Sequence, residues 1–266
     1  SRSRMIDDGW GFEGDRVIAY IKDPEIFVVF DIVKARVEEY FTMANLWHTR
    51  RIVEQGDHWY DTVYDQIGSD ELPENRHLLI YFPDTHFRLE GTETETRHYQ
   101  TETLIHQTTA HHFELGETEG FVTVLVPHEA GESPESWVDR IRLIEPVPAR
   151  TGLGVVIEDG EKTITVGVKQ DLRMDIARDW RRPRYTYDAG RIQFDQIESN
   201  GDFVFASLVD GELNYTITNL TKATYGEQVL YEGRPSYFYL AFDGSRDASG
   251  IGKMRYWRGE GNLEPS

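Results

Sequence analysis

Short apolar and alternating segments of strand length, separated by turn residues, make up almost the whole chain. Ile26 to Phe30 is almost fully apolar and rich in β-branched and aromatic residues, which predicts a buried strand. The run GFVTVLV, closed by Pro127, predicts another buried strand. Trp59 to Ile67 alternates, and every second side chain of a strand lies on one face. Asp61 and Asp65 are therefore expected beside each other on one strand face.

The same pattern predicts further strands over residues 16–22, 37–47, 77–82, 86–90, 99–107, 137–144, 153–157, 162–168, 191–197, 203–209, 212–218 and 237–242. An Asp-Gly pair between two apolar runs, as at 159–160 and 210–211, indicates a tight hairpin. A helical pattern is confined to the short stretch 171–180. Strands this short and this regularly interrupted predict an all-β fold, an antiparallel multi-stranded β-sandwich with two packed sheet layers.

Two prolines and a glycine, Pro146, Pro148 and Gly152, interrupt any strand ladder near the middle of the chain. The length of 266 residues suits one large β-domain or two smaller ones. We therefore expect a first β-sheet sub-domain over residues 1–148, which contains all the histidines, and a second β-sandwich sub-domain over residues 149–266.

The charge of the chain limits its partners. It has 47 acidic and 28 basic residues, a formal net charge of -19. A nucleic-acid binder needs a basic field, and an anionic membrane repels an acidic surface, so we expect neither partner. The sequence has no run of about 20 apolar residues of the kind that crosses a bilayer. It also has no cysteine, which excludes disulfides and thiolate chemistry.

All the histidines lie in the first half of the chain: His48, His58, His77, His86, His98, His106, His111, His112 and His128. Imidazole is the commonest transition-metal ligand and titrates near physiological pH, so clustered histidines indicate a metal site or proton transfer. No local zinc signature such as HExxH is present, but strands can bring distant ligands together. The carboxylates Asp61 and Asp65 could bind a metal or orient a histidine. The competing interpretation is that these are ordinary strand histidines and solvated acids.

Two segments combine basic residues with aromatic rings, RRPRYTY at 181–187 and KMRYWR at 253–258. Guanidinium groups bind carboxylates and sulfates in a bidentate geometry, and aromatic faces suit sugar rings. Arg182, Arg184 and Tyr185 are therefore candidates for binding an anionic carbohydrate. The alternative is that the arginines pair with the protein's own acids and the rings fill the core.

Several segments resemble the C-terminal β-sheet region of heparinase II/III-like polysaccharide lyases: VVFDIV, ANLWH, FVTVLVP, TVGVKQDL and KMRYWR. The resemblance extends over most of the chain. In that family an N-terminal helical toroid packs on an antiparallel β-sandwich region, and the enzymes cleave uronic-acid polysaccharides by β-elimination. A base removes the proton at C5 of the uronate, and an acid, usually Tyr, protonates the leaving oxygen, while Asn, His or Arg neutralises the carboxylate.

The resemblance also implies a zinc ion that braces the sheet domain. The ligand set that it implies is His48, Asp65 and His106, with Asp61 and His98 as alternatives. Members of the family often have a catalytic histidine two residues before the metal-binding one, where this chain has Leu46. The resemblance therefore implies that His48 is a metal ligand and not a catalytic residue.

The resemblance implies a sheet domain that forms one wall of the cleft for an acidic polysaccharide. It would act with a helical toroid domain of the same enzyme, in a secreted or periplasmic location. This chain has no pattern of the long helices that supply the family's Asn and Tyr, so we expect it to be inactive alone. The competing class is a non-catalytic carbohydrate-binding or structural β-sandwich, for which the histidines are incidental.

Overall fold

A computed structural model of the chain describes residues 1–7, 9, 11–63, 76–97, 100–170, 174–175, 184–185, 190–233, 239–242, 254–258 and 262–263. Strands dominate these residues and their sheets are antiparallel, which confirms the predicted all-β fold. The chain divides into two compact units, Ser1–Ile141 and Arg142–Ser266. The sequence pattern placed this boundary between residues 148 and 149.

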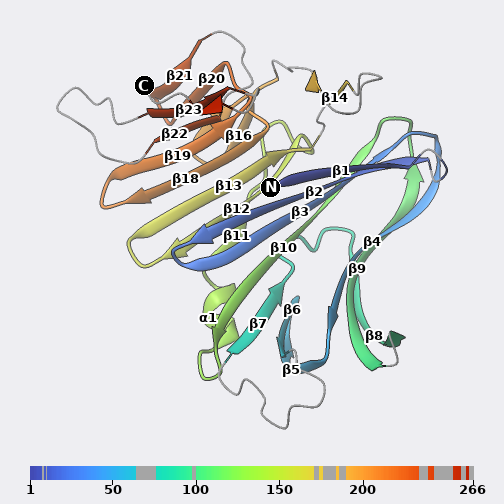
Figure 1. Ribbon diagram of the computed structural model, residues 1–266. Helices are drawn as coiled ribbons and strands as arrows, with labels where there is room; N and C mark the ends of the chain where they lie inside the picture. Colours follow the sequence, from blue (N-terminus) through green and yellow to red (C-terminus); the bar gives the residue numbers. More distant parts are fainter. Residues whose placement is uncertain are drawn as a thin grey trace. The chain divides into compact units, whose positions relative to one another are not determined.

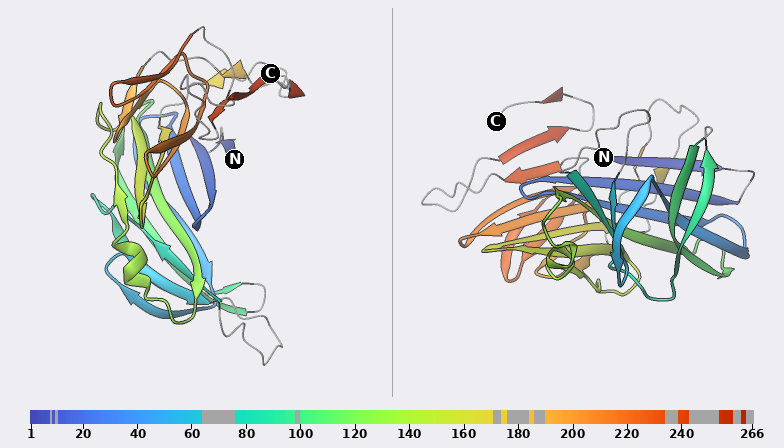
Figure 2. Two further views of the ribbon diagram at one scale, coloured as in Figure 1. Left: turned by 90° about the vertical axis from the view of Figure 1, so that its left-hand side faces the viewer. Right: turned by 90° about the horizontal axis from the view of Figure 1, so that it is seen from below.

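The first unit contains a seven-stranded sheet of order β1-β2-β3-β10-β7-β6-β5 and a three-stranded sheet of order β4-β9-β8 (Figure 1). Their bounds are β1 (Arg2–Asp7), β2 (Phe12–Lys22), β3 (Glu25–Ala35), β4 (Glu39–Thr49), β5 (Arg51–Gly56), β6 (Trp59–Val63), β7 (Arg76–Tyr81), β8 (Leu89–Arg97), β9 (Gln100–Phe113) and β10 (Thr118–Glu129). A short helix, α1 (Pro134–Val138), follows β10. Figure 2 shows that the long strands of this unit, coloured blue to green, bend along their length.

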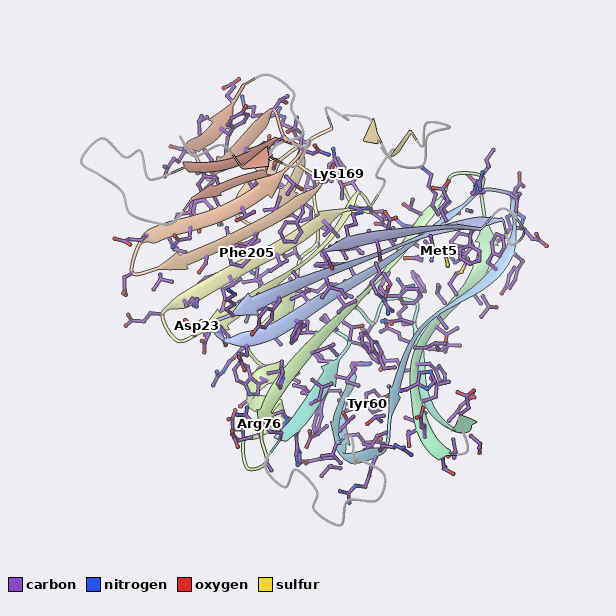
Figure 3. The ribbon with its side chains drawn as sticks, viewed as in Figure 1. Met5, Asp23, Tyr60, Arg76, Lys169 and Phe205 are labelled. Atoms are coloured by element: carbon purple, nitrogen blue, oxygen red, sulfur yellow. The ribbon has the colours of Figure 1, made fainter. Side chains whose placement is uncertain are left out.

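The two sheets of the first unit pack on each other through two apolar clusters. One cluster joins Phe121 of β10 to Phe113 of β9. The other joins Tyr60 of β6, labelled in Figure 3, to Ile105 of β9. A buried hydrogen bond also crosses between the layers. Nδ2 of Asn45 on β4 donates it to the hydroxyl of Thr123 on β10, at 2.6 Å. The predicted sandwich arrangement therefore holds for this unit.

The second unit has the same layered construction. An eight-stranded sheet has the order β11-β12-β13-β18-β19-β22-β23-β24, a four-stranded sheet has the order β16-β17-β20-β21, and β14 pairs with β15. The bounds are β11 (Ile141–Leu143), β12 (Gly152–Asp159), β13 (Lys162–Lys169), β14 (Met174–Asp175), β15 (Arg184–Tyr185), β16 (Ile192–Phe194), β17 (Ile197–Ser199), β18 (Phe203–Val209), β19 (Glu212–Thr218), β20 (Lys222–Tyr225), β21 (Gln228–Glu232), β22 (Tyr239–Phe242), β23 (Met254–Arg258) and β24 (Asn262–Leu263). Val204 and Ile217 of the larger sheet share one core cluster with Phe194 and Ile197 of the smaller sheet.

Many strands differ in extent from the predicted ones: for example, residues 191–197 contain β16 and the start of β17, and β9 continues well beyond residue 107. Two of the differences have a clear local cause. Residues 137–144 form the end of α1 and then β11, because Pro134 opens a helical turn and Glu135 places an acid in its first turn. The strand expected to stop at Pro127 continues to Glu129. Pairing of β10 with β3 ends at Leu125, so β10 has only β7 as a neighbour at the proline, and a missing N–H is tolerated there.

Candidate metal centre

Three neighbouring strands of the seven-stranded sheet, β6, β7 and β10, bring an aspartate and two histidines together. His77 and His128 are directly paired across β7 and β10. Asp61 is paired with Leu79, which lies two residues from His77 and hence on the same face of β7. The labelled Arg76 in Figure 3 precedes His77 and marks this end of β7. The sheet thus joins Asp61 to histidines that are 16 and 67 residues away in the sequence.

The Asp61 carboxylate binds both imidazole rings. Nδ1 of His77 lies 2.6 Å from Oδ2, and Nε2 of His128 lies 3.1 Å from Oδ1. The side chains of His128 and Asp61 are 1% and 5% exposed, while that of His77 is 16% exposed. The carboxylate therefore bridges two rings in a nearly solvent-inaccessible environment, and the group is most open to solvent at His77.

Both ring nitrogens of His128 have fixed directions. Nδ1 lies 3.0 Å from the backbone oxygen of Glu129, so a proton on Nδ1 is donated there. Nε2 then faces Asp61. A metal-binding histidine needs a lone pair on the coordinating nitrogen, and a hydrogen bond from the other nitrogen to a backbone carbonyl is a usual way to secure it. His128 is therefore oriented as a ligand through Nε2.

Burial and hydrogen bonding act in opposite directions on the two charged groups. Burial on its own raises the pKa of Asp61, but hydrogen bonds from His128 and His77 outweigh it, so the pKa of Asp61 lies below its ordinary value. Burial on its own lowers the pKa of His128. The hydrogen bonds to Asp61 and to the Glu129 carbonyl, with the charges of Asp61 and Glu132, outweigh it, so the pKa of His128 lies above its ordinary value. In the metal-free protein, Asp61 thus faces an imidazolium ion at mildly acidic pH.

The three side chains suit a transition-metal ion. In the part of the chain that the structure describes, they are the only group of three or more His, Cys, Asp or Glu residues whose ligand atoms all lie within 4.8 Å of one another. Two imidazoles and one carboxylate, with water or a fourth residue, form a common zinc site. Bonds of about 2.0–2.1 Å to a tetrahedral ion separate ligand atoms by about 3.3 Å. Movements of under about 1 Å would therefore admit the ion.

The histidines expected to bind metal lie on the other sheet of the first unit. His48 is on β4 and His106 is on β9. Nδ1 of His48 lies 3.4 Å from a carboxylate oxygen of Glu102, and neither histidine belongs to the group around Asp61. Asp65, the carboxylate of the expected set, lies outside the described residues. The structure thus brings together the alternative aspartate of the sequence analysis with two different histidines.

The candidate carbohydrate-binding residues have little or no described geometry. Arg184 and Tyr185 form β15, which pairs with β14. Arg182 and the alternative ligand His98 lie outside the described residues.

Sequence reasoning missed both histidine partners of Asp61. The predicted end of the strand at Pro127 placed His128 outside the sheet, whereas β10 continues through it. A usable signal existed, because His77 opens the predicted strand 77–82 and His128 directly follows Pro127, which closes the predicted strand 120–126. Pairing these two strand ends would have suggested that the histidines meet.

A second polar network joins the two sheets of the first unit. Glu90 on β8 accepts a hydrogen bond from Nε2 of Gln107 at 2.9 Å, and its other oxygen lies 3.1 Å from Nδ1 of His58. Gln107 is fully buried and also donates to the backbone oxygen of Asp84. His58 adopts a left-handed conformation with φ 65° in the turn between β5 and β6. This network ties that turn to β8 and explains why the unusual conformation is held.

Comparisons with known proteins add no assignment. No family model matches the chain, and a search of curated proteins found no match. Within the described parts of the chain, no helix combines the length and the apolar character needed to cross a membrane.

Proposed function

We propose that the first unit is a metal-binding β-domain that holds one zinc ion on Asp61, His77 and His128. The observation that carries the proposal is the convergence of three ligand atoms within 4.8 Å. Imidazole and carboxylate ligands together suit zinc, which has no strong geometric preference of its own. The hydrogen bond from His128 to a backbone carbonyl supports the same conclusion.

The ion would act as a structural brace. Its ligands come from three adjacent strands, and two of them are almost inaccessible to solvent. A ligand that binds only the folded state stabilises it by RT ln(1 + [L]/Kd), about 2.7 kcal/mol at a hundredfold excess over Kd. When bound, zinc would cross-link the side chains of β6, β7 and β10, which are connected only by hydrogen bonds in the metal-free sheet.

Metal analysis tests this proposal. The wild-type chain, purified without chelator and incubated with zinc, should retain one zinc per chain after gel filtration. His77→Ala and His128→Ala should lose it, whereas the matched variants His48→Ala and His106→Ala should keep it. A wild-type chain without stoichiometric zinc would refute the proposal, and loss of zinc only in His48→Ala would move the site to the three-stranded sheet.

On the sequence resemblance, we further propose that this domain is the sheet part of a heparinase II/III-like polysaccharide lyase. It would form one wall of the cleft for an acidic polysaccharide, with a helical toroid as its partner in a secreted or periplasmic enzyme. Support comes from the layered antiparallel architecture. The ligand set around Asp61 differs from the set that the resemblance implies. The candidate carbohydrate contacts remain Arg182, Arg184 and Tyr185.

An absorbance assay for unsaturated products separates this role from its alternative. Alginate or a glycosaminoglycan should give no absorbance rise with this chain alone, and a rise on adding a helical toroid domain supports the lyase. Saturable binding of the same polysaccharides with no cleavage under either condition would favour the alternative, a non-catalytic carbohydrate-binding β-sandwich.

A further inference from the structure

The three-stranded sheet β4-β9-β8 lies at one side of the first unit (Figure 1), and one of its faces is open to solvent. Along β4 the exposed residues Ala44 and Leu46 alternate with the buried residues Met43 and Asn45. Cross-strand pairing puts even-numbered residues of β9 and odd-numbered residues of β8 on the same face as Ala44. We call the surface formed by these positions of the three strands the outer face.

Large apolar side chains are exposed on and beside the outer face. Leu46 on β4 is 46% exposed, and Leu89 at the start of β8 is 72% exposed. Phe87, two residues before Leu89, is 84% exposed. The level of the sheet that contains Leu46 and the level that contains Leu89 include no carboxylate or guanidinium group on this face. Soluble monomers rarely expose large contiguous apolar patches, so the outer face has the character of an interface.

The loop before β8 holds Phe87 in this exposed position. Phe87 has a left-handed backbone with φ 55°, which is costly for a bulky residue and persists only where the surroundings hold it. The Asp84 carboxylate accepts a hydrogen bond from the backbone N–H of His86, at 3.2 Å. The side chain of Arg88 is buried and donates to Glu119, at 2.8 Å. These polar contacts fix the chain on both sides of Phe87.

A second copy of the outer face matches this surface in size. Ala44 and Leu89 pair with the same β9 residue, and so do Leu46 and Gly91, so each pair lies at one level of the sheet. A twofold axis along β9, between two copies, places β4 of one copy over β8 of the other and keeps these levels. Leu89 then faces Ala44 of the second copy, and Leu46 faces its Gly91. A Cβ on Gly91 would lie 2.9 Å from Nε2 of His106, so glycine lets that ring lie against the strand and keeps the surface low.

Charge and area agree with this partner. One level further along, His48 and Glu93 pair with the same β9 residue, so the twofold arrangement places His48 of one copy near Glu93 of the other. Both side chains reach solvent. Three strands about 4.8 Å apart, over about ten residues each, offer roughly 500 Å² per copy. The total of about 1,000 Å² is at the lower limit for a specific interface and fits a weak dimer.

We propose that the first unit forms a homodimer by packing its outer face on the outer face of a second copy, about a twofold axis along β9. The two sheets pack like the layers of a sandwich, about 10 Å apart and nearly aligned. Phe87 adds to the contact at its margin. A contact that uses the same surface on both copies closes on itself and gives a dimer, not a filament. The dimer is independent of the zinc site, whose ligands lie on the seven-stranded sheet.

Analytical ultracentrifugation of the full chain tests the dimer. The wild type should pass from monomer to dimer as its concentration rises through the micromolar range. Leu46→Glu and Leu89→Glu each put a carboxylate into an apolar level of the outer face, and each should weaken the dimer at least about tenfold. Val53→Glu is the matched control, because Val53 is similarly exposed but lies on β5 of the other sheet, and it should dimerise like the wild type.

Cross-linking tests the position of the axis. The chain has no cysteine, so one introduced cysteine is a unique label. An axis along β9 places the exposed Ala110 of the two copies opposite each other, at roughly the 10 Å spacing of stacked sheets. A short bis-maleimide should therefore join Ala110→Cys into a covalent dimer and leave Val53→Cys monomeric.

Each contrary outcome overturns a defined part of the proposal. A wild type that stays monomeric at every concentration removes the homodimer and leaves the outer face to a different partner. A dimer that is unchanged in both glutamate variants, or cross-linking of Val53→Cys alone, overturns the assignment to this face. Weakening by the glutamate variants without cross-linking of Ala110→Cys overturns the axis along β9. Circular dichroism checks that each variant is folded, and cross-linking decides in place of a glutamate variant that is not.

Discussion

Replacing Asp61 by Asn tests whether this carboxylate holds the two histidines in place. Asp61 accepts a part-buried hydrogen bond from His77, at 2.6 Å, and a buried one from His128, at 3.1 Å. A hydrogen bond to a charged group contributes about 1.5–3 kcal/mol, and breaking a buried ion pair costs about 3–5 kcal/mol. Asn keeps the shape and one acceptor oxygen. We therefore expect the metal-free Asp61→Asn protein to lose about 3 kcal/mol of unfolding free energy at pH 5.5.

The expected loss depends on pH in a defined direction. The folded-state pKa of Asp61 is lowered, so its stabilising effect is present above the unfolded value of about 4 and is lost as the pH falls through the folded value. The folded-state pKa of His128 is raised, so its stabilising effect is complete below the unfolded value of about 6.5 and is lost as the pH rises through the folded value. The difference between wild type and variant should be largest between pH 4 and 6.5, roughly.

Urea unfolding in the presence of a chelator, at pH 5.5 and pH 9, measures this difference. Asp31→Asn is the control, because Asp31 pairs with the half-exposed Arg16 on the same sheet and should cost under about 1 kcal/mol. Two results would refute the reasoning: an equal loss for Asp61→Asn at both pH values, or a loss under about 1 kcal/mol at pH 5.5.

Three further predictions concern the layers and the ion. Thr123→Val removes the 2.6 Å hydrogen bond from Asn45 and leaves a buried amide without this acceptor, so it should lower the unfolding free energy in urea by about 1–3 kcal/mol. Thr123→Ser keeps the hydroxyl and should lower it less, and equal losses would contradict this. Gly167→Ala puts a methyl group 2.6 Å from the fully buried Phe194 ring and should lower the unfolding free energy by about 1–3 kcal/mol. Adding Phe194→Leu should restore part of this loss, and an unchanged unfolding free energy in Gly167→Ala would count against tight packing there. Zinc at a hundredfold excess over Kd should raise the unfolding free energy by about 2.7 kcal/mol, reversed by chelator, and a melting temperature indifferent to zinc would disprove binding to the folded state.

Local chemistry allowed the second-unit hairpins to be predicted closely. Strands expected at 203–209 and 212–218 have these bounds in the structure. Asp210 and Gly211 between them have φ values of 50° and 79°, as a tight hairpin turn requires. Such turns depend on two residues and their immediate neighbours, so the sequence pattern contains the necessary information. The helix α1 was missed because its five residues are too few to show a helical period.

The candidate site was predictable only in part. The alternation of β6 identified Asp61 as a carboxylate on a defined strand face. Its partners depend on β6, β7 and β10 being neighbours, and β7 and β10 are separated in the chain by β8 and β9, which belong to the other sheet. A period of two determines the face on which a side chain lies, but contains no information about which strand is adjacent.

The sequence by itself determined the all-β class, the antiparallel hairpins and a first half rich in histidine, because side-chain alternation and turn residues act over a few positions. Only the tertiary structure decided which histidines meet a carboxylate. Pairing of β10 with β7 beyond Pro127 places His128 opposite His77, and that register is set by packing across the whole sheet. His48 and His106, the expected metal ligands, lie on β4 and β9 of the three-stranded sheet, and this strand pairing too is decided only by the tertiary structure.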